Sequence, residues 1–314
     1  AVTIVNDPPV ANAQYVETTL NTAKAITLAG SDSSNDPLSY AIVTSPSHGG
    51  ITGTAPNVTY TPATDYAGAD NFSFKANDGV SDSPSATVTI CVAQWQWWTN
   101  MAAGNWSVGA NWFGSAAPAI GGGTNVVLNF NGSTYASASS NDLSGAFTLN
   151  RLNFGSALPA LMLGGNALSF TSNSVALPQL NQGSANAVTI SNALALGASA
   201  TFGGSGAGAL TLSGVVSGAG SLIKTSSGTL TLGGTGVNTF SGGTLVNDGT
   251  LALNQNRFNL GSGTVTLADG SLFQTLNFEG NTSGGALTNT FYLSGGIATN
   301  YTSKDIWITG PVTG

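Results

Sequence analysis

Charged side chains are scarce in this chain of 314 residues, which has only six Lys or Arg residues and 13 Asp or Glu residues. The basic residues form no clusters, so we expect no nucleic-acid partner. No run of about 18 or more apolar residues occurs, so the sequence predicts no membrane span. The single cysteine, Cys91, excludes an internal disulfide. It lies in the alternating segment TVTICVA, which favours a buried thiol over an intermolecular bridge.

Small and hydroxyl-bearing residues take the place of the missing charge, because Gly, Ser, Thr, Asn and Ala dominate the composition. Low charge together with Val, Leu, Ile and Phe at regular strand spacing predicts a folded all-β chain instead of a disordered one. The acids are unevenly placed. Residues 1–93 hold eight acids against two lysines, whereas residues 94–314 hold five acids against four bases.

The first part of the chain, residues 10–93, contains short alternating segments separated by turn signals, among them AITLAG, LSYAIV, VTYTPA, NFSFKAND and ATVTICVA. About seven short strands in so short a stretch predict an antiparallel Greek-key β-sandwich. Its landmarks are D-x-x-x-D-x-L-x-Y from Asp32 to Tyr40, SPSHGG at 45–50, YTP at 60–62, D-Y-x-G-x-D-x-F at 65–72 and NDG at 77–79. These motifs resemble the cadherin-like bacterial Ig-type repeat, and the resemblance implies an extracellular spacer or adhesive unit.

Calcium is the one cofactor that the sandwich suggests, since modules of this kind are in some cases stiffened by Ca²⁺. The resemblance places its acidic turns at Asp32, Asn35, Asp36, Asp70 and Asp78. Carboxylate and amide oxygens are ligands that Ca²⁺ accepts. The alternative is that these residues only form turns, where Asp and Asn accept backbone hydrogen bonds. No other cofactor is expected.

Residues 94–124 form a tryptophan-rich hinge that holds five of the six tryptophans of the chain. They are Trp95, Trp97, Trp98, Trp106 and Trp112. The repeats that follow the hinge, described below, predict a solenoid, and the first coil of a solenoid has an open apolar end that must be covered. Covering this end and packing between the domains are therefore the favoured roles of the tryptophans. A carbohydrate or partner site is the alternative. The segment G-N-W-S-x-x-x-N-W (Gly104 to Trp112) resembles the opening of passenger domains with autotransporter-associated β-strand repeats.

Residues 125–314 repeat a short alternating strand at a regular interval. The repeats open at Ala146, Ala167, Ala187, Ala209, Thr229, Thr250, Ser271 and Phe291. This period of about 20 to 22 residues, with two-residue alternation inside it, predicts a stack of parallel β-coils. The segment GAGSLIKTSSGTLTLGGTGVNTFSGGTLVNDGTLAL (218–253) is similar to the autotransporter-associated repeat, which implies a right-handed parallel β-helix exported to the bacterial surface or beyond.

An enzymatic role is not expected. Asp248 and Asp269 lie one repeat apart, so they could stack on neighbouring coils as a glycosidase pair does. Both lie in turn tripeptides, NDG and ADG, whose conformational demands explain them without chemistry.

Two non-enzymatic functions remain open. The first is an extracellular structural protein that assembles with its own copies, head to tail or by strand donation, into a filament or surface layer. Residues 1–9 would form a spare strand, with Val2, Thr3, Ile4 and Val5 as the donor, and Ile306, Trp307 and Ile308 would form an open solenoid end. The second is a stalk or adhesin that binds a cell-surface glycan or protein. The spare strand and the open solenoid end would be equally expected in a segment cut from a longer array of tandem repeats. The start at Ala1 without Met favours a processed or excerpted sequence.

Overall fold

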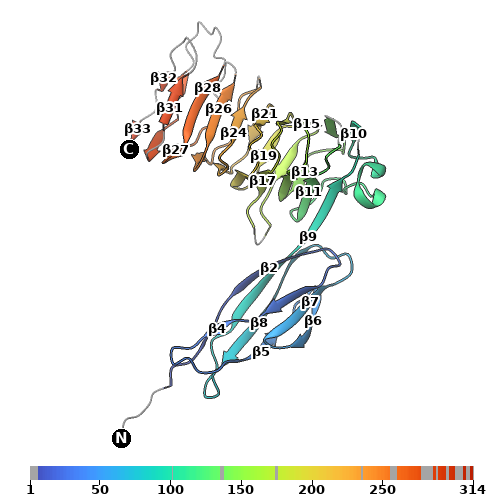
Figure 1. The fold of residues 1–314 in the computed structure, drawn as a ribbon, viewed down its shortest axis with the longest axis vertical. Coiled ribbons are helices and arrows are strands. Elements are labelled where there is room, and N and C mark those ends of the chain that lie inside the picture. The colour runs from blue at the N-terminus through green and yellow to red at the C-terminus, as the bar shows by residue number, and fades with distance from the viewer. Residues whose placement is uncertain are drawn as a thin grey trace. The chain divides into compact units, whose positions relative to one another are not determined.

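The protein is built from β-strands, and its structure is a computed structural model that describes residues 6–100, 102–134, 138–173, 176–234, 236–254, 260–276, 286–287, 289–294, 297–300, 307–308 and 312–313. The chain divides into two compact units, Ala1–Trp95 and Gln96–Gly314, and the division falls within strand β9 (Ala86–Trp98) (Figure 1). The helical segments described are two short 3₁₀ turns, η1 (Gly109–Asn111) and η2 (Phe113–Ser115). No helix in the described residues is long and apolar enough to cross a membrane.

The first unit is a two-sheet sandwich. One sheet has the strand order β5-β8-β9-β2, the other has the order β3-β7-β6, and β1 pairs with β4 at the side. The strands are β1 (Val10–Ala11), β2 (Gln14–Thr19), β3 (Lys24–Thr27), β4 (Gly30–Ser31), β5 (Ser39–Thr44), β6 (Gly49–Thr54), β7 (Asn57–Pro62) and β8 (Gly68–Asn77). All pairs are antiparallel except β2 with β9, which is parallel. No hairpin joins these two strands, so nothing forces them to run in opposite directions.

The core of the sandwich follows from alternation along β8, where every second side chain is buried. Phe72 and Phe74 on β8 pack with Tyr60 on β7 and with Val88 and Ile90 on β9. These side chains are fully buried. Cys91 lies beside this core on β9 and is also buried, as the sequence predicts.

The second unit is a parallel β-solenoid with three sheets, each of which takes one strand from successive coils (Figure 1). Sheet 1 starts at β9 and continues through β11 (Val126–Phe130), β14 (Arg151–Phe154), β17 (Gln179–Gln182), β20 (Ala200–Gly203), β23 (Leu222–Lys224), β25 (Thr244–Val246), β27 (Val265–Ala268), β30 (Phe291–Ser294) and β33 (Val312–Thr313). Sheet 2 contains β10 (Gly104–Asn105), β12 (Ala138–Asn141), β15 (Leu161–Gly165), β18 (Val188–Ile190), β21 (Leu210–Leu212), β24 (Thr229–Leu232), β26 (Thr250–Asn254), β28 (Leu272–Leu276) and β31 (Ile297–Asn300). Sheet 3 contains β13 (Phe147–Leu149), β16 (Leu168–Phe170), β19 (Leu194–Leu196) and β22 (Val216–Ser217), and the short strands β29 (Ala286–Leu287) and β32 (Trp307–Ile308) pair with each other.

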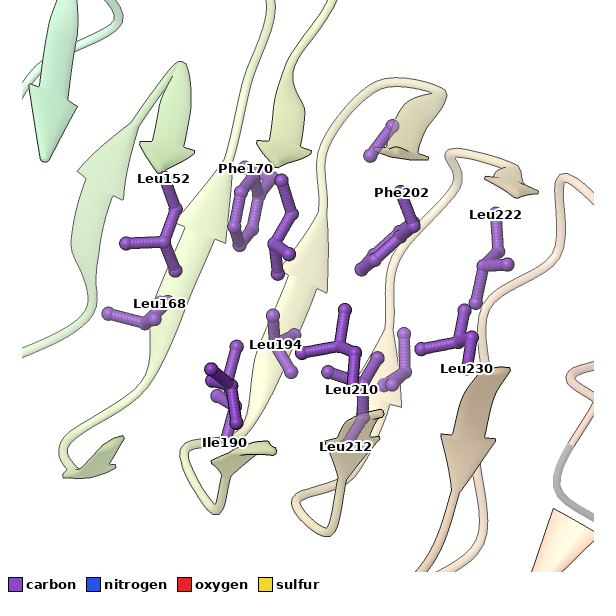
Figure 2. Packing of buried hydrophobic residues seen from close by; sticks show 14 of the residues in the cluster. Leu152, Leu168, Phe170, Ile190, Leu194, Phe202, Leu210, Leu212, Leu222 and Leu230 are labelled. Carbon is purple, nitrogen blue, oxygen red and sulfur yellow. The ribbon is translucent and has the colours of Figure 1, made fainter. Parts of the chain in front are cut away.

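Matching side chains of successive coils form the solenoid core. On sheet 2, Val188 pairs with Leu210 and Leu210 with Leu230, while on sheet 3 Leu168 pairs with Leu194. Figure 2 shows side chains of this core pointing into the space between the sheets, one coil after another. Each coil therefore buries its apolar side chains against its neighbours, which is why a single coil could not fold alone.

The repeat openings do not all fall in one sheet, although their regular spacing predicts that they are equivalent. The segments after Ala146 and Ala167 are the sheet 3 strands β13 and β16, and the segment at Phe291 is the sheet 1 strand β30. The openings from Ala187 to Ser271 lead sheet 2 strands. Because one coil holds up to three short strands with the same apolar alternation, the period alone could not distinguish them.

Coil length varies more than the sequence period indicates. Asn153 and Asn181, which pair on β14 and β17, lie 28 residues apart. Asn129 and Asn153, which pair one coil earlier on β11 and β14, lie 24 residues apart. The extra residues of the longer coil lie outside sheet 1, where the pairing stays in register. The strands therefore keep their alignment, and the connections between them take up the difference in length.

Asparagine side chains connect neighbouring coils. On the outward side of sheet 1, the amide of Asn153 donates to Asn129 Oδ1 at 2.8 Å, and the amide of Asn181 donates to Asn153 Oδ1 at 2.9 Å. At a corner, Asn192 Nδ2 donates to the backbone carbonyls of Gly164 and Asn166 at 2.8 and 2.7 Å. These amides supply partners for polar groups at the sheet surface and at the corners.

Candidate functional site

Three hinge tryptophans close the first coil of the solenoid. Trp98, Trp106 and Trp112 are each at most 1% exposed and belong to the solenoid core. The Trp98 and Trp112 rings lie 5.1 Å apart and perpendicular, and Trp106 packs edge-on against Trp112 at 5.7 Å and Phe147 at 5.2 Å. Edge-to-face contacts of this kind are favourable for aromatic rings. This group of three is called the aromatic cap below.

The polar atoms of the aromatic cap are hydrogen bonded. Trp106 Nε1 donates to Ser139 Oγ at 2.9 Å, and Trp112 Nε1 donates to the carbonyl of Trp106 at 2.9 Å. The amide of Asn111 donates to the carbonyl of Asn105 at 2.7 Å, which fixes the η1 turn between the two tryptophans. Indole N–H groups need such partners when they are buried, so the local turns and the ring packing support each other.

A carboxylate fastens the cap to the second coil. Asp142, next to β12, accepts hydrogen bonds from the backbone N–H of Ser107 at 2.8 Å and from its hydroxyl at 2.5 Å. Burial raises the pKa of Asp142, but the hydrogen bonds from Ser107 outweigh it and hold the pKa below its ordinary value. Sequence reasoning did not assign this role, because Ser107 and Asp142 lie 35 residues apart.

A hollow of about 360 Å³ lies outside the cap, lined by Trp97, Trp98, Thr99, Phe113 and Asn131. Phe113, in η2, is 75% exposed, which is unusual for so large an apolar side chain. Trp97 is half-buried. Every lining residue belongs to the second unit. The sequence pointed to Trp97 and Trp98. It gave no signal for Phe113, and at Asn131 it showed only an N-x-S pattern, which an Asn- and Ser-rich chain produces by chance.

The five expected calcium ligands do not come together. Asp32, Asn35 and Asp36 share one turn between β4 and β5, where Asp32 Oδ1 accepts from the N–H groups of Ser34 and Asp36 at 2.8 and 3.2 Å. Asn35 has a positive φ of 62°, as expected of a turn former. Among the described residues, no group of three or more His, Cys, Asp or Glu side chains is placed to hold a metal ion.

Asp70 lies elsewhere, buried on β8. Its carboxylate accepts from the N–H groups of Ser47 and His48 at 2.9 and 3.0 Å and from the Tyr60 hydroxyl at 2.9 Å. Burial, followed by the bond to Asp70, raises the pKa of Tyr60. Asp70 therefore holds the β5–β6 connection onto the sheet. This is a structural role that the motif spacing alone did not distinguish from metal binding.

Asp78 lies in a second turn, after the end of β8. It accepts hydrogen bonds from the N–H groups of Ser81 and Val80, both at 2.7 Å, and from the amide of Asn6 at 2.9 Å. The Ser81 bond, then the Asn6 and Val80 bonds, lower the pKa of Asp78 to about 2. This carboxylate is therefore ionised at neutral pH and fixes the start of the described chain to the β8–β9 turn.

Lys224 is fully buried inside the solenoid, where it pairs in register with Phe202 and Val246. Its Nζ donates to the backbone carbonyls of Ser226 and of Asp248, the latter at 2.9 Å. Burial lowers the pKa of Lys224 to about 8, and the nearby charge of Asp248 opposes this shift. The ammonium thus serves as a donor for turn carbonyls that face the interior.

Asp248 and Asp269, the pair considered for catalysis, are exposed turn residues. Asp248 Oδ1 accepts from the N–H of Gly249 at 2.7 Å. The following glycines, Gly249 and Gly270, have positive φ values of 67° and 76°. The turn geometry accounts for both segments.

The two expected assembly segments are only partly visible. Val2, Thr3, Ile4 and Val5 lie outside the described residues, and so does Ile306. Trp307 and Ile308 form β32, which runs parallel to β29. Of the hinge tryptophans outside the cap, Trp95 is 40% exposed at the end of the first unit.

A sandwich followed by a capped parallel solenoid defines a modular, all-β class of protein. Comparison with protein families names both modules. Residues 6–91 match the bacterial Ig domain, and residues 222–253 match the passenger-associated transport repeat. The chain carries these two modules, and they are those of a bacterial surface or extracellular β-helical protein. Both resemblances expected from the sequence are confirmed.

Comparison with whole proteins adds little. No curated protein matches the chain. Among solved structures, an endo-fucoidan hydrolase from glycoside hydrolase family 107 matches with a TM-score of 0.24 and 23% identity, over 30% of this chain and 14% of the hydrolase. A likeness this low carries no functional argument.

Proposed function

We propose that the protein is an extracellular structural protein whose solenoids associate with one another into a filament or surface layer. The observation that carries this proposal is the near absence of charge on the second unit. Residues 96–314 hold nine charged side chains, four basic and five acidic, and one of the nine, Lys224, is buried. A surface with net charge close to zero offers little repulsion between copies.

The side of the solenoid supplies a suitable contact. On sheet 3, the outward residues Thr148, Ser169, Ala195 and Ser217 pair in register over four coils. All four are small and partly exposed. A regular row of small side chains lets a second flat surface approach closely, as in stacked sheets. This row is called the sheet 3 row below.

The aromatic cap limits the modes of assembly. Because Trp98, Trp106 and Trp112 cover the first coil, a neighbouring solenoid cannot stack its core directly on that end. We therefore favour contact along the sheet 3 row. Strand donation by Val2–Val5 is the second mode and is tested separately.

The test is the mass and shape of the full chain, measured by sedimentation over a range of concentrations and by negative-stain electron microscopy. Regular fibres or sheets of the wild-type chain are expected. Ala195→Lys, which adds a charge in the middle of the sheet 3 row, should shift the material toward monomers. Ser205→Lys is the matched control, because Ser205 is exposed in a turn outside this row.

A chain that begins at Asn6 distinguishes the two modes. If assembly uses the sheet 3 row, this truncated chain still assembles, whereas strand donation requires that it does not. Isolated rods at every concentration, for the wild-type chain as well, would overturn self-assembly and leave the stalk or adhesin as the function to pursue.

We propose Ca²⁺ binding only at the Asp32–Asp36 turn. Asp32 Oδ2 is shielded from solvent and accepts no hydrogen bond from the described residues. A bound Ca²⁺ would satisfy this oxygen. Calorimetric titration of the full chain with Ca²⁺ tests it: Asp32→Asn should abolish the binding heat, and Asp78→Asn should leave it unchanged.

We propose no catalytic activity. The support is the turn role of Asp248 and Asp269 and the structural role of Lys224 described above. Measurable release of reducing ends from polysaccharides, lost in Asp248→Asn and Asp269→Asn, would contradict this part of the proposal.

A further inference from the structure

We infer that the hollow beside the aromatic cap binds one neutral sugar ring of a glycan. This inference is independent of self-assembly, because it concerns a different surface. The hollow measures about 360 Å³ and lies within the second unit. That volume falls in the range of about 300 to 1,000 Å³ typical of small-molecule sites.

The lining has the chemistry of a sugar site. Phe113 and Trp97 offer aromatic surface, on which the C–H face of a pyranose can stack. Thr99 and Asn131 offer a hydroxyl and an amide, which can hydrogen bond to sugar hydroxyls. The Thr99 hydroxyl donates to the carbonyl of Asn111 at 3.3 Å, so its oxygen keeps its lone pairs for a ligand and acts as an acceptor.

The lack of ionisable side chains in the lining favours a neutral ligand. None of the five lining residues is ionisable, so an acidic sugar would lose hydration without gaining a partner for its carboxylate. A purely apolar peptide side chain would in turn cover the amide of Asn131 and offer it no hydrogen bond. A neutral hexose, which is apolar on one face and hydroxylated at its edge, satisfies both parts of the site.

The positions of the two outer groups are set by the fold. The buried ring of Trp112 lies in the aromatic cap, and the adjacent Phe113 in η2 is 75% exposed. The side chain of Asn131 lies over Gly155, where any Cβ would overlap Asn131 Oδ1. A glycine at position 155 therefore leaves room for the amide at the edge of the hollow.

The test uses methyl glycosides of glucose, galactose and mannose as probes, with saturation-transfer NMR on the full chain. At least one of these neutral glycosides should bind, and Phe113→Ala and Asn131→Ala should each weaken that binding by about tenfold. Phe113→Trp, which keeps an aromatic face, should retain it. Ile120→Ala is the matched control, because Ile120 is 73% exposed near η2 but does not line the hollow.

Three results would overturn the inference. They are the absence of binding by all three neutral glycosides, binding that is unchanged in both Phe113→Ala and Asn131→Ala, and binding of only a uronic acid or sialic acid glycoside. The melting temperature of each variant is measured alongside. Phe113 and Asn131 are exposed, so their substitutions are expected to leave the fold intact.

Discussion

Lys224 Nζ donates to the backbone carbonyl of Asp248, which belongs to the next coil, at 2.9 Å. A fully buried ammonium therefore connects two coils in the segment that matches the passenger-associated transport repeat. The same segment places Leu222 in the core, two residues earlier on β23.

The stability of the solenoid should depend on pH through the titration of Lys224. Its folded pKa, about 8, lies below the ordinary value of 10.5, so the unfolded chain binds the proton more tightly. Stability should therefore rise as the pH increases from 8 toward 10.5, by at most on the order of 3 kcal/mol. Denaturant unfolding of the full chain, followed through the solenoid transition, measures this. Lys224→Met should remove the rise, and equal slopes for the two chains would refute the assignment.

Removing a ring from the aromatic cap should destabilise the solenoid strongly. Trp106→Ala empties a buried site and leaves the Ser139 hydroxyl without its indole donor. We expect a loss of about 3 to 5 kcal/mol. Phe113→Ala, an exposed aromatic position close to the cap, should change stability by less than about 0.5 kcal/mol. Similar unfolding free energies for the two variants would show that the cap does not close the core.

Two glycines with similar backbone conformations allow the stability cost of backbone strain to be distinguished from the cost of a clash with the neighbouring coil. Gly165 and Gly145 have φ values of 96° and 80°, but a Cβ at Gly165 would overlap the carbonyl oxygen of Asn141, whereas a Cβ at Gly145 meets nothing within 4 Å. Gly145→Ala should cost about 1 kcal/mol from the left-handed conformation alone. Gly165→Ala should cost about 3 kcal/mol or more, because the neighbouring coil must move. Thermal unfolding of both variants tests this, and equal costs would contradict close coil contact.

Asp70→Ala should destabilise the sandwich. It removes the acceptor for the N–H groups of Ser47, His48 and Asn71 and for the Tyr60 hydroxyl in a buried setting, and we expect a loss of about 3 kcal/mol. Asp36→Ala, in an exposed turn, is the control and should stay within about 0.5 kcal/mol of the wild-type chain. Denaturant unfolding of the full chain, followed through the sandwich transition, measures the loss. A loss that appears only when Ca²⁺ is present would instead favour a metal role, because Ca²⁺ would then stabilise only the wild-type chain.

The architecture could be predicted because it depends on two periodic patterns, the two-residue alternation and the repeat spacing, that are visible in the sequence. Alternation at Leu210 and Leu212, repeated at Leu230 and Leu232, indicates strands, and their regular spacing indicates stacked coils. The phase of the repeat could not be predicted, because Phe147 and Val188 begin equally good strands in different sheets. Only the pairing partner decides between them.

The candidate site was less accessible to sequence reasoning. The tryptophans were conspicuous, because five of them lie in one short segment before the repeats, and this position suggested a cap. Phe113 carries no motif and Asn131 carries only an N-x-S pattern, which is common in an Asn- and Ser-rich chain, so nothing in the sequence predicted that both would line one hollow. The positions of the expected calcium ligands could not be predicted for a related reason. Asp32, Asp70 and Asp78 have similar local sequence settings, yet one is in a surface turn, one is buried, and one holds Asn6.

The unequal coils have a consequence for how such a chain can change over time. The longer step from Leu152 to Leu180 and the shorter step from Phe202 to Lys224 both keep their partners in register on sheet 1. Insertions between strands are thus absorbed outside the sheets, while a single-residue insertion within a strand would turn its apolar side chains outward. We therefore expect the connections to accept natural insertions or a grafted peptide, so that the solenoid gains surface loops while its sheets stay unchanged.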